Sequence, residues 1–151
     1  MRYLAAAART ERQVRARLAK AELSAQADGV IEWLRELRYL DDDAYARARA
    51  RSLIASGRIG PRTAERRLVR AGIAAGAARS AVVGALAAEA PGGEAAQCRA
   101  LALRRARGTP LEELDARARA RLARFLLGRG FSGSAVARAL GGFDDRDLED
   151  V

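Results

Sequence analysis

The sequence predicts an all-α protein: an elongated tandem array of three three-helix repeats, with about nine helices in total. Residues that start and stop helices recur along the whole chain, and no stretch keeps the alternation of β-branched and polar residues typical of a strand. Half of the 151 residues are hydrophobic, but many of these are alanine and only 5% of residues are aromatic. Because alanine favours helix yet buries little surface, several small cores fit this composition better than one large core.

The first module is expected at residues 1–40. Thr10 and Gln13 have the spacing of a capping box, and Ser24 can cap the following helix. Apolar residues then recur at helical spacing, which predicts that they face the core: Val14, Leu18, Val30, Ile31, Leu34 and Leu37.

The second module is expected at residues 41–90. Asp41 or Asp42 is a good N-cap, and three acids in a row stabilise the positive end of a helix over about 43–56. Gly57 suits the position that follows the helix end, and Pro61 suits the first position of the next helix. Gly72 then stops that helix.

The third module is expected at residues 91–142, after the linker "APGGE" at 90–94. We expect a helix near 94–106, then one that starts at Thr109-Pro110 and runs to about Leu127, and a last helix capped by Ser132. Residues 143–151 form an acidic tail that we expect to be frayed.

An internal repeat links the modules. Residues 67–86 and 125–140 share a skeleton of leucine, then glycine four positions later, then a large apolar residue. The matching pairs are Leu68 with Leu126, Gly72 with Gly130, Ile73 with Phe131, Ala78 with Val136, and Val82 with Leu140. The first module keeps Leu18 and Leu23 but has Glu22 at the glycine position.

The charge predicts an anionic partner. The formal net charge is +9, and all basic residues except Lys20 are arginine. An arginine-rich composition alone does not account for the excess of basic over acidic residues, so nucleic acid or an acidic protein surface is expected to bind.

The residue content excludes several kinds of site. With no histidine and a single cysteine, Cys98, zinc sites and Ser-His or Cys-His catalysis are excluded, and no internal disulfide can form. We also expect no other metal site, no cofactor and no enzyme activity. The lone cysteine and the lack of a signal or membrane-spanning segment favour the cytoplasm.

The candidate binding surface consists of arginines one helical turn apart. Like charges at this spacing repel, and an anionic partner would relieve that repulsion. In the middle module the candidates are Arg47, Arg51, Arg58, Arg62, Arg66, Arg67 and Arg70, and in the third module they are Arg117, Arg121 and Arg124. Arginine binds phosphate and carboxylate alike, so the pattern leaves DNA and acidic protein both open.

Direct base reading and aromatic stacking have little support in the sequence. There is no asparagine, the glutamines do not cluster and the aromatic residues are scattered. Trp33 and Phe125 have apolar-face spacing and are expected in the core, as is Tyr45.

Four segments resemble the RecX family of recombination regulators: "RTERQVRARL", "LRELRYLDDDAYARA", "GPRTAERRLVRAGI" and "RFLLGRGFSGSAVARAL", in that order between about Arg9 and Leu140. The resemblance implies a helical crescent of three-helix repeats. It further implies that the protein binds the RecA filament on DNA, suppresses its ATP hydrolysis and strand exchange, and so acts in DNA repair and the SOS response. The oligomeric state stays open, and we expect a monomer because nothing in the sequence demands a dimer. No catalytic residue or cofactor comes with it.

The chain departs from the family pattern in three places, one of which is the very short region before Arg9. The helix after "LDDD" has alanine at 46, 48 and 50 where larger side chains are usual, and the tail after Leu140 has no family motif. One alternative remains open: a basic helical protein that binds DNA, in architecture or transcription, without RecA.

Overall fold

The computed structural model describes residues 8–141, which are helical and contain no strand. The α-helices in this range are α2 (Glu11–Lys20), α3 (Ala27–Glu36), α4 (Asp42–Ala55), α5 (Pro61–Ala71), α6 (Ala75–Glu89), α7 (Gly93–Arg105), α8 (Ala116–Gly128) and α9 (Gly133–Leu140). Two 3-10 turns, η1 (Ser24–Gln26) and η2 (Leu111–Glu113), complete the described part. The all-α prediction is confirmed, with eight α-helices in this range where about nine were expected for the whole chain.

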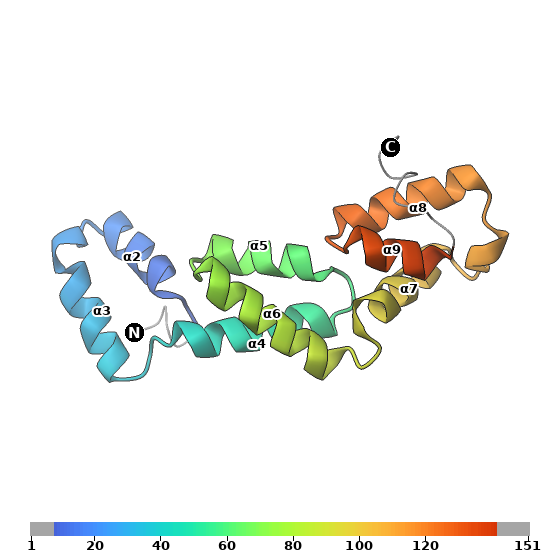
Figure 1. The fold of residues 1–151 in the computed structure, drawn as a ribbon. Helices are drawn as coiled ribbons and strands as arrows, with labels where there is room; N and C mark the ends of the chain where they lie inside the picture. The colour runs from blue at the N-terminus through green and yellow to red at the C-terminus, as the bar shows by residue number, and fades with distance from the viewer. Residues whose placement is uncertain (1–7, 142–151) are drawn as a thin grey trace.

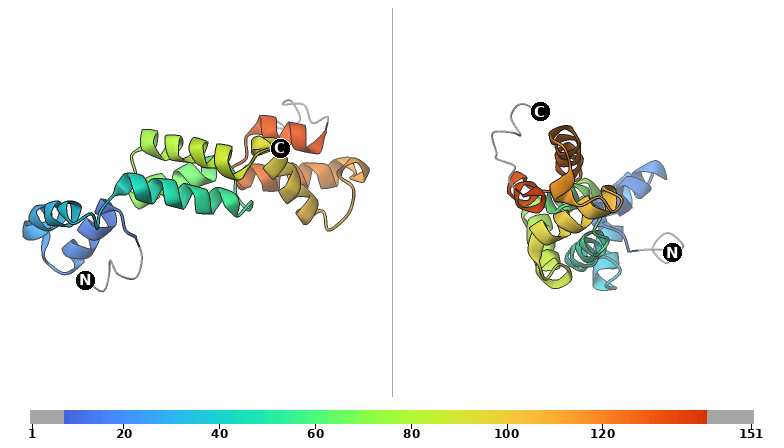
Figure 2. Two further views of the ribbon diagram at one scale, coloured as in Figure 1. Left: turned by 90° about the horizontal axis from the view of Figure 1, so that it is seen from below. Right: turned by 90° about the vertical axis from the view of Figure 1, so that its right-hand side faces the viewer.

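The molecule is elongated, with three helical groups in a row (Figures 1 and 2). Helices α2 and α3 lie at one end, α4 to α6 in the middle, and α7 to α9 at the other end. Each group has its own core: a small one around Ile31 and Leu34, one around Ile54 and Leu68, and one around Leu126 and Phe131. The alanine-rich composition gives small cores that each involve mostly the residues of one module. Modules that contact mainly their neighbours form a row, which explains the elongated shape.

The repeat found in the sequence is a repeated helix ending. The Ile73 amide donates to the Leu68 carbonyl at 3.1 Å, and the Phe131 amide donates to the Leu126 carbonyl at 3.3 Å. Between them lie Gly72 (φ +110°) and Gly130 (φ +91°), in the left-handed conformation that glycine adopts without strain. The eight other residues of the matching pairs are all buried, at most 4% exposed.

The first module ends its helix in the same way without a glycine. The Leu23 amide donates to the Leu18 carbonyl at 3.0 Å, and Glu22 takes the left-handed conformation at φ +60°. The repeat therefore extends to all three modules at the level of the backbone.

Several helix starts are confirmed. Thr10 and Gln13 form the capping box, and the Asp41 side chain accepts from the Ala44 amide at 2.7 Å. Pro61 lies at the start of α5, and Ser132 caps α9 through the Ala135 amide.

Two of the predicted helix starts were wrong. The Thr109-Pro110 pair precedes the η2 turn, and α8 begins only after Asp115, whose carboxylate accepts from the Ala118 amide at 2.6 Å. Ser24 opens the η1 turn, while α3 begins at Ala27 without a side-chain cap. In both cases a short 3-10 turn comes between the expected cap and the helix.

The expectation that Trp33 and Leu37 are buried was also wrong, since they are 47% and 46% exposed. Among the described residues, α3 packs mainly on α2 and η1, which cover only the side of the helix that carries Ile31 and Leu34. Phe125 is half-buried against the third core, and Tyr45 is half-buried against the middle core.

Direct contacts join neighbouring modules. At the first junction the Thr10 hydroxyl donates to the Ala71 carbonyl, and the Glu11 amide donates to Asp42 Oδ1 at 3.0 Å. Asp42 thus satisfies the start of a helix in another module, while Asp41 caps its own helix.

The second junction brings two backbone segments together. The Gly60 amide donates to the Arg129 carbonyl at 2.9 Å, and the Arg62 amide donates to the Gly130 carbonyl at 3.2 Å. A Cβ atom on Gly60 would lie 2.4 Å from the Gly130 backbone, so only glycine fits there. Arg104 also reaches across, donating to the Gly57 carbonyl at 2.6 Å.

Candidate anion-binding surface

All ten arginines predicted to bind an anion are exposed. The structure does not bring them to one place. It distributes them among a groove and a hollow of the middle module, the start of α5, and the surface of α8.

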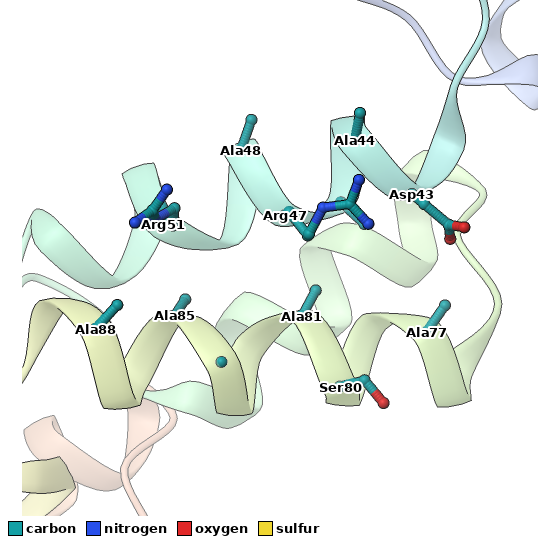
Figure 3. A pocket seen from close by; sticks show the side chains of 12 residues that line it. Asp43, Ala44, Arg47, Ala48, Arg51, Ala77, Ser80, Ala81, Ala85 and Ala88 are labelled. Atoms are coloured by element: carbon teal, nitrogen blue, oxygen red, sulfur yellow. The ribbon is translucent and has the colours of Figure 1, made fainter.

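The first site is a groove of about 670 Å³ between α4 and α6. Arg47 and Arg51 line its α4 side, and a row of alanines on α6 lines the other side (Figure 3). The small side chains leave the groove open, and the guanidinium groups give it a positive rim. Arg51 forms an ion pair with Glu89, with 3.2 Å between Nε and Oε1, whereas Arg47 forms no ion pair with any residue in 8–141.

The second site is a hollow of about 380 Å³ near the junction with the first module. Arg67 and Arg70 of α5 line it together with Arg49 of α4, and Tyr45 and Gln13 contribute polar groups. Three guanidinium groups from two helices therefore meet here without an acidic side chain in the lining.

Arg58, Arg62 and Arg66 lie near the second junction. The Arg66 side chain donates to the Thr63 hydroxyl at 2.7 Å, which orients its guanidinium along α5. The backbone amide of Arg62 is held by the third module, as described above, so this end of α5 is fixed in position.

In the third module, Arg121 lines a hollow of about 390 Å³ with Arg105 and Arg107. Arg117 and Arg124 are exposed on the same helix, α8, but are not among the residues lining this hollow.

The sequence patterns missed Arg49, Arg105 and Arg107. Arg49 lies between Arg47 and Arg51 in the chain but on another side of α4, so a search for arginines one turn apart passes over it. Arg105 and Arg107 stand at the end of a helix, and only the folded chain brings them to Arg121. The runs "ARARAR" and "RRARG" were the sequence features that could have indicated these three arginines.

Two kinds of site can be checked directly in the described residues, a metal site and a reactive thiol. No group of three or more acidic or cysteine side chains in 8–141 is placed to hold a metal ion. Cys98 is fully buried, and burial together with the nearby charge of Glu94 raises the pKa of its thiol to about 12. No helix in this range is long and apolar enough to span a bilayer.

Comparison with known proteins identifies relatives. A family model described as "RecX, third three-helix domain" matches residues 93–140. The crystal structure of RecX from Lactobacillus salivarius superposes with a TM-score of 0.73 at 19% identity, covering 99% of this chain and 92% of that one. A crystal structure of regulatory protein RecX superposes with a TM-score of 0.70 at 28% identity, covering 88% of this chain and 65% of that one. No curated protein sequence matches the chain.

Proposed function

We propose that the protein is a regulator of the RecX type, which binds the RecA–DNA filament and inhibits its ATP hydrolysis and strand exchange. The support is the match of residues 93–140 to the RecX family model and the similarity of the fold to the RecX structures. It would thereby regulate recombinational repair in the cytoplasm. It would act by binding, as a monomer, with no reaction of its own and no cofactor.

The observation that carries this proposal is the spacing of positive charge along an elongated body. The groove lined by Arg47 and Arg51, the hollow lined by Arg67 and Arg70, and the hollow lined by Arg121 belong to two successive modules. A filament presents the same acidic protein surfaces and phosphates at regular intervals. An extended protein with repeated positive sites is suited to such a partner.

The proposed mechanism is bridging. Several weak contacts on one body reinforce each other through effective concentration, because the first contact holds the others close to their partners. A protein bound to two neighbouring RecA subunits would oppose their relative movement. ATP hydrolysis and strand exchange would slow if they need that movement.

The test is the single-strand-dependent ATPase of RecA, measured with substoichiometric amounts of this protein. We expect inhibition by the unaltered chain. In the double variant Arg67→Glu/Arg70→Glu, the concentration needed for half-inhibition should rise about ten-fold or more, since two charge-assisted contacts become repulsive.

The matched control is Arg79→Glu/Arg138→Glu, which makes the same change in net charge. Both of these arginines are exposed and line none of the three sites. Equal loss of inhibition in the two double variants would mean that net charge alone acts, and no inhibition by the unaltered chain would refute the proposal.

The alternative, DNA binding without RecA, makes different predictions. It expects tight binding to naked duplex and an unchanged RecA ATPase. The salt dependence of binding distinguishes contacts with DNA phosphates from contacts with RecA. The logarithm of affinity falls by about 0.9 per duplex phosphate contact for each tenfold rise in salt. A shallow slope would place most contacts on RecA itself.

A further inference from the structure

The third module has a hollow whose lining combines charge with an aromatic ring. It lies between the end of α7 and α8 and has a volume of about 390 Å³. Three of its eight lining residues are arginines, Arg105, Arg107 and Arg121, and the other five are apolar. Four of these five apolar residues, Phe125 among them, belong to the third core or pack against it.

The aromatic ring holds two of the guanidinium groups in this region. The Cζ atom of Arg105 lies 5.1 Å from the centre of the Phe125 ring, and that of Arg129 lies 5.0 Å from it. Both distances are within the range of a cation–π interaction. Because these guanidinium groups are held over the ring, part of their ordering is complete before a ligand arrives.

The positive charge at the hollow is not neutralised by the described residues. Arg105, Arg107, Arg121 and Arg129 form no ion pair with any side chain in 8–141, although acidic residues lie on the neighbouring turn. Glu112 faces Arg99 at 4.0 Å, and Asp115 caps its own helix.

The backbone at Arg107 places this residue beside the hollow. Its φ is +53°, the left-handed conformation of a residue that follows a helix end, as at Glu22, and Gly108 follows with φ +91°. The turn puts Arg107 on the rim of the hollow, opposite α8.

We propose that this hollow binds single-stranded nucleic acid, with one base stacked on the Arg105–Phe125 pair and the adjoining phosphates bound by Arg107 and Arg121. Bases of a single strand stack on aromatic rings and on guanidinium planes, and in a duplex those faces are covered by neighbouring bases. The function proposed above assigns no site for unpaired bases, and this hollow in the third module would supply one.

The chemistry of the lining favours nucleic acid over an acidic peptide. The side chains of the hollow offer hydrogen-bond donors, from arginine, and no acceptors. A phosphodiester has only acceptors and is fully satisfied by such a lining. A peptide would bring backbone N–H groups that no side chain there could accept, which costs free energy on burial.

The test is fluorescence anisotropy of a labelled oligo-dT of about 15 nucleotides, with RecA absent. We expect Arg105→Gln and Phe125→Leu each to weaken binding about five-fold or more, since stacking contributes that much per base. The double variant Arg107→Gln/Arg121→Gln should also make the salt dependence shallower, by about 1.4 in slope for two single-strand phosphate contacts.

The slope of the logarithm of affinity against the logarithm of salt concentration distinguishes base stacking from charge attraction. Phe125→Leu should weaken binding with the slope unchanged, because it removes no charge. Arg138→Gln, a neutralisation elsewhere in the same module, should leave affinity within about two-fold of the unaltered chain if stacking and local charge dominate. Circular dichroism checks the fold of each variant, and the exposed Arg105 carries the test if Phe125→Leu is unfolded.

Three results would overturn the proposal. These are equal effects of Arg105→Gln and Arg138→Gln, equal affinity for a duplex of the same length, and displacement of the oligonucleotide by polyglutamate at equal charge concentration. Since RecA is absent, none of them bears on filament regulation, and the ATPase assay of the same variants tests that separately.

Discussion

Replacing Glu22 by glycine should stabilise the first module. Glu22 stands at the position that glycine occupies in the other two modules, and its φ of +60° is left-handed. This conformation costs a residue with a Cβ atom about 1–2 kcal/mol. Glycine removes that cost but adds about 0.4–1 kcal/mol of conformational entropy to the unfolded chain. The net gain expected is about 0.5–1 kcal/mol.

The chain contains a natural probe for this measurement. Trp33 is the only tryptophan and lies on α3, in the first module. Its fluorescence during urea denaturation therefore follows the unfolding of this module even if the other modules unfold separately. We expect the midpoint for Glu22→Gly to move to higher urea with an unchanged slope.

Glu32→Gly is the matched control, because it removes the same side chain and charge from the interior of α3. Glycine there should destabilise the module by about 1 kcal/mol, the opposite direction. An unchanged or lower midpoint for Glu22→Gly would refute the reasoning from the left-handed conformation. A higher midpoint in both variants would show that loss of negative charge is responsible.

Three further outcomes are expected. Gly60→Ala should destabilise the chain by about 1–3 kcal/mol in denaturation, because its Cβ atom would overlap the Gly130 backbone. The hydrogen bond from Arg15 lowers the pKa of Glu11 below 4.5, so the first module should lose stability as pH falls below that value, and Glu11→Gln should lose this dependence when Trp33 fluorescence is followed. The Cys98 thiol, with its pKa raised to about 12, should react with dithiobis-nitrobenzoate at pH 8 only after denaturation.

Features set by neighbouring residues could be predicted from the sequence. The caps at Thr10, Asp41 and Ser132 depend on side chains that accept from amides three positions away, so the local pattern contains the information. The shared skeleton around Gly72 and Gly130 was visible for the same reason, since a helix ending involves only about six consecutive residues.

Features that depend on how separate helices pack together could not be predicted from the sequence. The spacing of Trp33 and Leu37 fits an apolar helix face, but whether that face is covered depends on what packs against α3. The hollow that joins Arg49 to Arg67 and Arg70 combines two helices, and no single-helix pattern contains it. The ten predicted arginines are exposed, and whether they bind an anion stays a prediction.

The junction between the second and third modules connects the fold to the proposed function. Gly130 ends α8 in the left-handed conformation, and its carbonyl also accepts from the Arg62 amide in the middle module. A Cβ atom on Gly130 would lie 2.3 Å from the Thr63 hydroxyl. Gly130 therefore both ends its helix and allows the middle module to pack closely against the third module. The spacing between the middle sites and the third hollow therefore depends in part on this backbone contact, in addition to the hydrogen bond from Arg104 to the Gly57 carbonyl. If bridging underlies inhibition, Gly60→Ala should weaken it while leaving every arginine in place, whereas independent binding at each site would leave inhibition unchanged in a folded variant.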